Sequence, residues 1–310
     1  MLLTYIRRWR ESIRSTVRVA VFTALVLGFC HPAEAQADLQ KLVDTEQQFD
    51  RAVAVDARAA YLGFLSSDSI VFKTDAASGI EFWRTDDLSA SRQLIRTLTL
   101  SDISANGMLG YTTGSWRSYE RKKSDASARF GQYVTIWEKQ PDGRFLAAVD
   151  IGITHEKLPF RETDRRGDIR ITRDMNERGW SPADASMNFL RMSMTTSTLG
   201  GAFRKFAAPD VRLLRDGAPP ITGKKRVVRE MMNYRSVEFP SKVNMFQAAD
   251  LAYFWNRCEF ASSSEGMEKG NCLHIMKLRK KKWWIVLGVF SRAENPVVPI
   301  LKQRQTARQD

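Results

Sequence analysis

The feature that most constrains the fold of this chain is an order of helices and strands that occurs twice. In each copy, two short helices with apolar residues at helical spacing come before a strand, and hairpin-connected strands follow. Asp68 and Asp210 are 142 positions apart, as are Tyr111 and Tyr253. Because chance matches would drift over such a length, we expect two similar α+β units, each with helices before a curved antiparallel sheet.

The pattern predicts the elements of both copies. In the first copy, it predicts helices at residues 39–53 and 56–65 and strands at 68–72, 107–116, 131–139 and 145–151. In the second, Ser181 is a predicted helix N-cap and Pro182 the first helical residue. A helix and a strand are expected within 199–214, and strands at 249–260, 270–278 and 283–290. We therefore expect domains at residues 36–158 and 182–294, a charged linker at 159–181 and a tail at 295–310.

The first 35 residues have the order of a secretory signal peptide. Five arginines come before an apolar run at 19–29, and Ala33-Glu34-Ala35 offers a cleavage site of small residues. An uncleaved anchor is the alternative, but the run is shorter than the ~20 residues that span a bilayer. A lipoprotein site at Cys30 is disfavoured because bulky Phe29 precedes it. We expect cleavage after Ala35 and a periplasmic or secreted protein.

The mature chain is basic. The formal charge is +13, and +10 remains once the predicted leader, with five arginines and two glutamates, is removed. A basic surface could meet nucleic acid or anionic lipid. The exported destination argues against nucleic acid, and we expect membrane contact only through the uncleaved signal peptide. The densest basic run, residues 277–282, lies between two strands and is interpreted as a solvated hairpin turn.

Few residues in the mature chain could bind metal or form a disulfide. Cys258 and Cys272 flank residues 262–270, and either a disulfide or two buried thiols fits that placement. His155 has no evident partner, and His274 is expected to pack in a core. The chain has no Cys/His spacing for zinc, no Gly-rich phosphate loop and no Gly-x-Ser-x-Gly elbow. We therefore expect no metal and no cofactor.

A hairpin in the first copy carries a resemblance to a known family. The chain reads Gly-x-Tyr-x-Thr-x-Trp at residues 131–137 and Asp-Gly-x-Phe at 142–145. This resembles the SnoaL-like (DUF4440-type) group of the nuclear transport factor 2-like superfamily, over most of residues 37–154 and more weakly over 182–294. The resemblance implies two tandem cones, in each of which a curved sheet wraps helices around a deep pocket. Members include isomerases, cyclases, dehydratases and hydrolases, and also many non-catalytic binding or assembly modules.

Asp150 interrupts an apolar strand, so it should be exposed, paired or functional. The Pro-Asp-Gly turn at 141–143 predicts that Val134 pairs with Asp150, which places Gln132, Val134 and Ile136 on the same face. In ketosteroid isomerases, which resemble this hairpin, that face lines the pocket. Asp150 is therefore a candidate general acid or base, and pairing with an arginine or a backbone group is the alternative.

Other pocket residues follow from position and from the resemblance. Trp83, Tyr111 and Trp116 are further candidates for the pocket wall. The base and the tyrosine of ketosteroid isomerases have no counterparts, because 71–73 holds no acid and Phe49 has no hydroxyl. In the second copy Asp150 aligns with Gly288 or Val289, so the second pocket is expected to be structural.

Three hypotheses of function remain open. The first is an exported, non-catalytic tandem module that binds a small apolar or amphipathic ligand or a protein partner. The second is a metal-independent isomerase, cyclase or dehydratase that uses Asp150. The third is a structural pair whose two cones pack as a pseudo-dimer.

Overall fold

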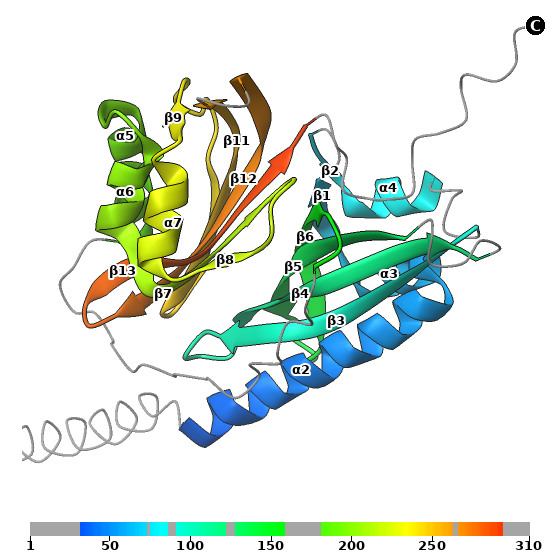
Figure 1. Cartoon of the computed structure of the whole chain (residues 1–310). Helices are drawn as coiled ribbons and strands as arrows, with labels where there is room; N and C mark the ends of the chain where they lie inside the picture. The colour runs from blue at the N-terminus through cyan, green and yellow to red at the C-terminus, as the bar shows by residue number, and fades with distance from the viewer. Residues whose placement is uncertain are drawn as a thin grey trace, which may run out of the picture.

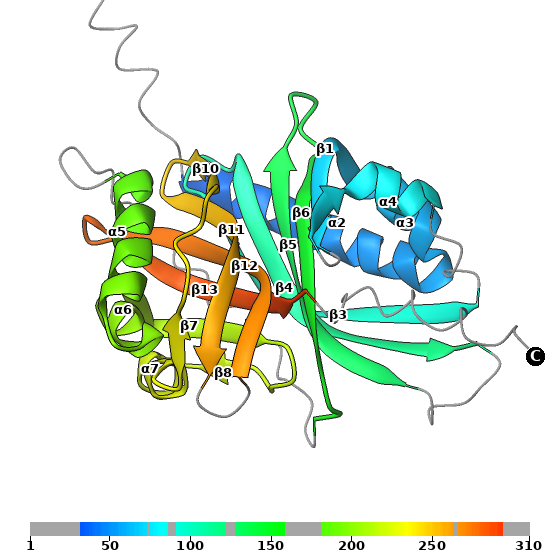
Figure 2. The ribbon, with the colours of Figure 1, turned by 90° about the horizontal axis from the view of Figure 1, so that it is seen from above.

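The computed structural model describes residues 32–72, 75–85, 91–121, 128–158, 181–262 and 266–293. The apolar part of the predicted signal peptide, the linker at 159–180 and the tail lie outside these residues. The described chain forms two α+β units with curled sheets (Figure 1). The two sheets lie between two sets of helices, as Figure 2 shows.

The first unit combines three helices with a six-stranded sheet. Its elements are α2 (Pro32–Val55), α3 (Ala57–Phe64), β1 (Leu65–Phe72), β2 (Ala76–Ser78), α4 (Gly79–Thr85), β3 (Arg92–Ile103), β4 (Leu109–Glu120), β5 (Arg129–Lys139) and β6 (Phe145–His155). The strand order is β2-β1-β6-β5-β4-β3, and only β1 and β6 run parallel. The predicted cleavage site after Ala35 falls within the start of α2.

The second unit has the same strand order. Its elements are α5 (Pro182–Thr195), α6 (Leu199–Phe206), β7 (Ala207–Arg215), β8 (Ile221–Thr222), α7 (Lys224–Met231), β9 (Tyr234–Ser236), β10 (Asn244–Ala248), β11 (Leu251–Ser262), β12 (Gly266–Arg279) and β13 (Lys282–Arg292). The order is β8-β7-β13-β12-β11-β10, β7 and β13 run parallel, and β9 also pairs with β11. Ser181 caps α5 with Pro182 as its first residue, which confirms that part of the prediction.

The apolar side chains form three cores. One lies between α2–α4 and the first sheet, and one between α5–α7 and the second sheet. The third joins the opposite faces of the two sheets, with Ile136 and Ile151 from the first and Leu273 and Val289 from the second. Each sheet is therefore buried on both faces, with helices on one side and the other sheet on the other.

Buried polar contacts also join the units. The Lys277 ammonium lies 3.2 Å from a carboxylate oxygen of Asp102 and 3.3 Å from one of Asp250. At another place, Asp216 accepts hydrogen bonds from the backbone N–H groups of Thr154 (2.6 Å) and Arg292 (2.7 Å). These contacts fix how one sheet lies on the other.

The predicted register of β5 on β6 is wrong by one residue. The turn itself forms as expected, with Gln140 N–H donating to the Arg144 carbonyl at 2.7 Å. The pairing then skips Ala148, so that Thr135 rather than Val134 lies opposite Asp150. This β-bulge exchanges the two faces of β6 beyond it.

Cys258 and Cys272 form a disulfide between β11 and β12. In the part of the chain that the structure describes, no helix is long and apolar enough to cross a membrane. The same residues contain no cluster of three or more side chains suited to a metal ion.

Candidate functional site

A cavity of about 40 Å³ lies between the helices and the sheet of the first unit, and we call it the first cavity. The residues that define its chemistry are four aromatic side chains and two charged ones, namely Tyr61, Trp83, Trp116, Tyr133, Arg96 and Asp150. Each of the six comes from a different element, from α3 and α4 to β3, β4, β5 and β6.

Arg96 on β3 is the centre of the site. Its side chain is only 1% exposed, and it forms ion pairs with Glu46 (2.8 Å), Asp50 (3.1 Å) and Asp150 (3.2 Å). It also donates to the hydroxyls of Tyr61 at 3.0 Å and Thr135 at 2.8 Å. Since a guanidinium has five N–H donors, these five acceptors account for all of them. Arg96 is therefore held in place by the protein and has no donor left for a ligand.

Asp150 on β6 lies between this arginine and the cavity. Its Oδ2 accepts from Arg96 and, at 2.6 Å, from the Thr135 hydroxyl. Its Oδ1 accepts only from the Tyr61 hydroxyl, at a long 3.3 Å. The side chain is 14% exposed. One oxygen is thus fixed, whereas the other retains capacity to accept a hydrogen bond from a molecule in the cavity.

Two further carboxyl groups lie behind Arg96 on α2. Glu46 is fully buried and accepts hydrogen bonds from Arg96, Thr112 and the Trp137 indole. Burial, and then the nearby Glu46 carboxylate, raise the pKa of Asp50 well above its ordinary value, although Arg96 acts in the opposite direction. This shift favours the protonated form of Asp50. Three carboxyl groups thus share one guanidinium beside the cavity.

Two polar atoms on the cavity wall lack partners. The Trp83 indole N–H and the Tyr133 hydroxyl are buried and make no hydrogen bond within the described chain. Trp83 stacks on Tyr61, with ring centroids 3.9 Å apart, and the Arg96 guanidinium lies 3.7 Å from the Tyr133 ring centroid. A buried polar group without a partner costs free energy, which a ligand can recover.

The predicted site residues divide into two groups. Trp83, Trp116 and Asp150 line the first cavity. The other four, Tyr111, Gln132, Val134 and Ile136, lie on the opposite face of the sheet, toward the second unit. Gln132, for example, accepts a hydrogen bond from Arg212 at 3.0 Å. For the three residues of β5, the bulge at Ala148 is the reason, because it places Tyr133 and Thr135, rather than their neighbours, on the face of Asp150.

Sequence reasoning missed Arg96, Tyr61 and Tyr133. Residues 92–103 form β3, a strand that the sequence analysis does not predict. The signal was present, because Leu94, Arg96 and Leu98 alternate with exposed or half-buried residues and all three are buried. Like Asp150, an arginine at an apolar position of a strand needs a partner for its charge. In the structure, Arg96 and Asp150 pair with each other.

No protein-family model matches this sequence, and no curated protein matches it. Solved structures with similar folds include an NTF2-like protein of unknown function from Shewanella oneidensis, at 15% identity and a TM-score of 0.30, over 36% of this chain and 96% of the other. An NTF2-like protein from Cytophaga hutchinsonii matches at 12% identity and a TM-score of 0.31, over 36% and 94%. A protein of unknown function with a cystatin-like fold from Nostoc punctiforme matches at 13% and 0.29, over 40% and 100%. Similarity at this level says nothing about ligand or activity.

Proposed function

We propose that this chain is an exported protein of two tandem nuclear transport factor 2-like units that binds a small amphipathic molecule in the first cavity without transforming it. The observation that supports binding is the set of unused hydrogen-bonding atoms on an aromatic wall. These atoms are Asp150 Oδ1, the Trp83 indole N–H and the Tyr133 hydroxyl. Together they suit a flat, mostly apolar molecule with one donor and one acceptor.

The surroundings of Asp150 favour binding over proton transfer. A general base must be within reach of the proton that it takes and free to accept it. Asp150 Oδ2 is already occupied, because it accepts from Arg96 at 3.2 Å and from the Thr135 hydroxyl at 2.6 Å. Asp150 therefore acts as a fixed hydrogen-bond acceptor.

The test uses 2-pyridone as the probe, a flat ring with one N–H donor and one carbonyl acceptor, and N-methyl-2-pyridone as its matched partner without the donor. Binding is followed through the Trp83 indole N–H resonance, assigned with Trp83→Phe. We expect 2-pyridone to shift this resonance and the methylated ring to bind about tenfold more weakly, since it cannot donate to the charged Asp150. Asp150→Asn should reduce the preference for 2-pyridone.

The control compares the two faces of β5. Tyr133→Phe removes a hydroxyl on the cavity face and should weaken binding, whereas Gln132→Leu alters the opposite face and should leave it unchanged. Equal effects of these two variants, or no shift of the Trp83 resonance up to the solubility of 2-pyridone, would contradict the proposal.

The remaining hypotheses correspond to other outcomes. If the protein is an isomerase, cyclase or dehydratase, the parent protein should convert small carbonyl or hydroxyl compounds added to it. Asp150→Asn should then lose this conversion. A purely structural pair, in which the two units act as an internal pseudo-dimer, would bind neither probe.

A further inference from the structure

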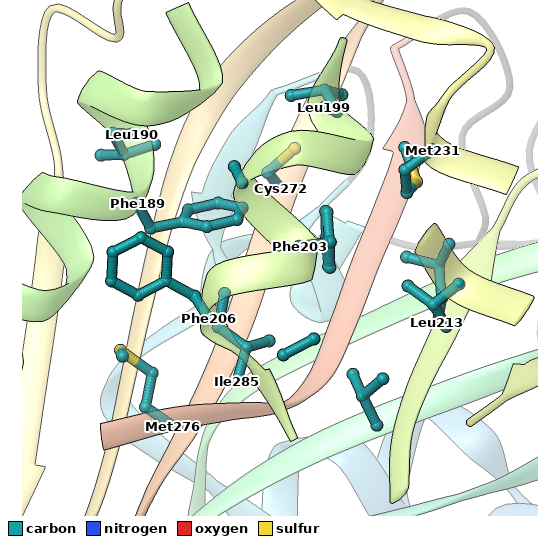
Figure 3. Packing of buried hydrophobic residues seen from close by; sticks show 14 of the residues in the cluster. Phe189, Leu190, Leu199, Phe203, Phe206, Leu213, Met231, Cys272, Met276 and Ile285 are labelled. Atoms are coloured by element: carbon teal, nitrogen blue, oxygen red, sulfur yellow. The ribbon is translucent and has the colours of Figure 1, made fainter. Parts of the chain in front are cut away.

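The second unit contains a cavity of its own, which we call the second cavity. It also measures about 40 Å³ and lies under α5–α7. Its wall is apolar, with Phe189, Phe203, Leu213 and Met231 among the lining residues (Figure 3). The Cys258–Cys272 disulfide forms another part of the wall. The sequence analysis expected this region to be structural because it lacks an acid.

Strand register shows how the second cavity differs from the first. Gly288 lies opposite Leu213 and His274, as Asp150 lies opposite Val71 and Thr135 in the first sheet. The position of the acid is therefore a glycine. Among the residues that the structure describes, the charged ones that line the wall are Arg215, which pairs with Glu230 and Glu268 at 3.7 Å each, and Glu238, which is exposed.

Two buried side chains on the wall have polar atoms without partners. His274 Nδ1 and Asn256 Oδ1 make no hydrogen bond within the described residues, although His274 is only 6% exposed and Asn256 only 2%. The His274 ring stacks on Phe254, with centroids 4.7 Å apart, and lies 4.9 Å from the Phe189 ring centroid. Both side chains line the second cavity.

The imidazole is uncharged at physiological pH. Burial lowers the pKa of His274 to about 3, so the ring is neutral at any pH at which the protein works. A neutral imidazole offers one donor and one acceptor, and the Asn256 carbonyl adds an acceptor. Both groups can form hydrogen bonds with a hydroxyl.

We propose that the second cavity is an independent binding site for a neutral apolar molecule that carries a hydroxyl group, such as a phenol or an alicyclic alcohol. The apolar wall accommodates the hydrocarbon part, and the hydroxyl accepts a hydrogen bond from the protonated Nδ1 of His274 and donates one to Asn256 Oδ1. This site does not depend on the ligand proposed for the first cavity, because its lining residues are entirely different.

The test uses phenol and toluene, which have the same size and differ only in the hydroxyl. Binding is followed through the methyl resonance of Met231, which lies on the wall of the second cavity, whereas the first cavity has no methionine on its wall. We expect both probes to shift the resonance and phenol to bind about two- to tenfold more tightly, the effect of one net hydrogen bond.

Two variants identify the polar groups. His274→Phe keeps the aromatic stack and Asn256→Leu keeps the volume, and each should reduce the preference for phenol while toluene still binds. Trp83→Phe, which alters the first cavity, should leave the Met231 response unchanged. The proposal is overturned if phenol and toluene bind equally, if both variants retain the preference, or if neither probe shifts the Met231 resonance up to its solubility limit.

Discussion

At the scale of single residues, the first cavity depends on Arg96 and its three carboxyl partners. Removing a partner from a buried ion pair leaves an uncompensated charge, and the cost depends on burial and on the contacts that remain. Glu46 is completely buried and holds Arg96 from the side away from the cavity, whereas Asp150 is partly exposed. The two acids therefore differ in role although both contact the same guanidinium.

Glu46→Gln should be much more destabilising than Asp150→Asn. Glutamine cannot supply the negative charge that the buried Arg96 guanidinium needs, so we expect the free energy of unfolding to fall by ~3–5 kcal/mol. Asparagine at 150 still accepts from Thr135, and the Asp150 side chain is partly exposed, so that loss should be ~1–2 kcal/mol. Urea denaturation measures both, and similar losses would show that Asp150 is as structural as Glu46.

At the scale of elements, the β-bulge at Ala148 decides which side chains reach the cavity. The sequence predicts the helix–strand order, the Pro-Asp-Gly turn and the capped start of α5, because each depends on local residues. A bulge depends on how both faces of β6 pack, and both faces are apolar here, so periodicity could not place it. The second sheet has an irregularity at the corresponding place, between Ile275 and Met276.

Deleting Ala148 should remove the bulge without turning Asp150 away from the cavity. The pairs Trp137–Ala147 and Ile136–Val149 become consecutive, so Thr135 still lies opposite Asp150 and only the local bend of β6 is lost. We expect the free energy of unfolding to fall by ~1–3 kcal/mol, the usual range for a single change in a buried element. Thermal unfolding followed by circular dichroism measures it. One extra glycine after Gly143, in the exposed turn, is the matched control and should change little.

The candidate site could be predicted only in part, for a related reason. Asp150 stood out as a charge in an apolar strand, and Trp83 and Trp116 as large aromatics. Arg96 was missed because β3 was not recognised, and the partner of Asp150 is 54 positions away in sequence. Tyr133 was placed on the wrong face because the predicted register lacked the bulge. The site could not be predicted further because the Arg96–Asp150 pair joins distant parts of the sequence and because the bulge at Ala148 leaves no signal in the residue types.

At the scale of the whole molecule, the sheets share a core that neither unit can complete alone. Lys277 of the second unit is 1% exposed at the side chain and lies between Asp102 and Asp250, one from each unit. Its ammonium also donates to the Ile103 carbonyl at 2.7 Å. The ion triad thus contributes to the joint between the units.

Lys277→Met should weaken the joint and the whole fold together. The change leaves two buried carboxyl groups without their cation, so we expect a loss of ~3–5 kcal/mol. Because the sheets share a core, unfolding should remain a single transition. Lys225→Met, at an exposed position of α7, is the control and should lie within about 0.5 kcal/mol of the parent. Two separate transitions in the parent protein would contradict the shared core.

The back-to-back sheets have a consequence for stoichiometry. Two identical subunits that associate in this way must carry identical cavities and come apart on dilution. Here one chain supplies both halves, so the two cavities can differ, and Gly288 in the second sheet stands at the position that Asp150 has in the first. Each molecule therefore has one cavity of each kind at every protein concentration. A second copy of one unit would not replace the cavity of the other.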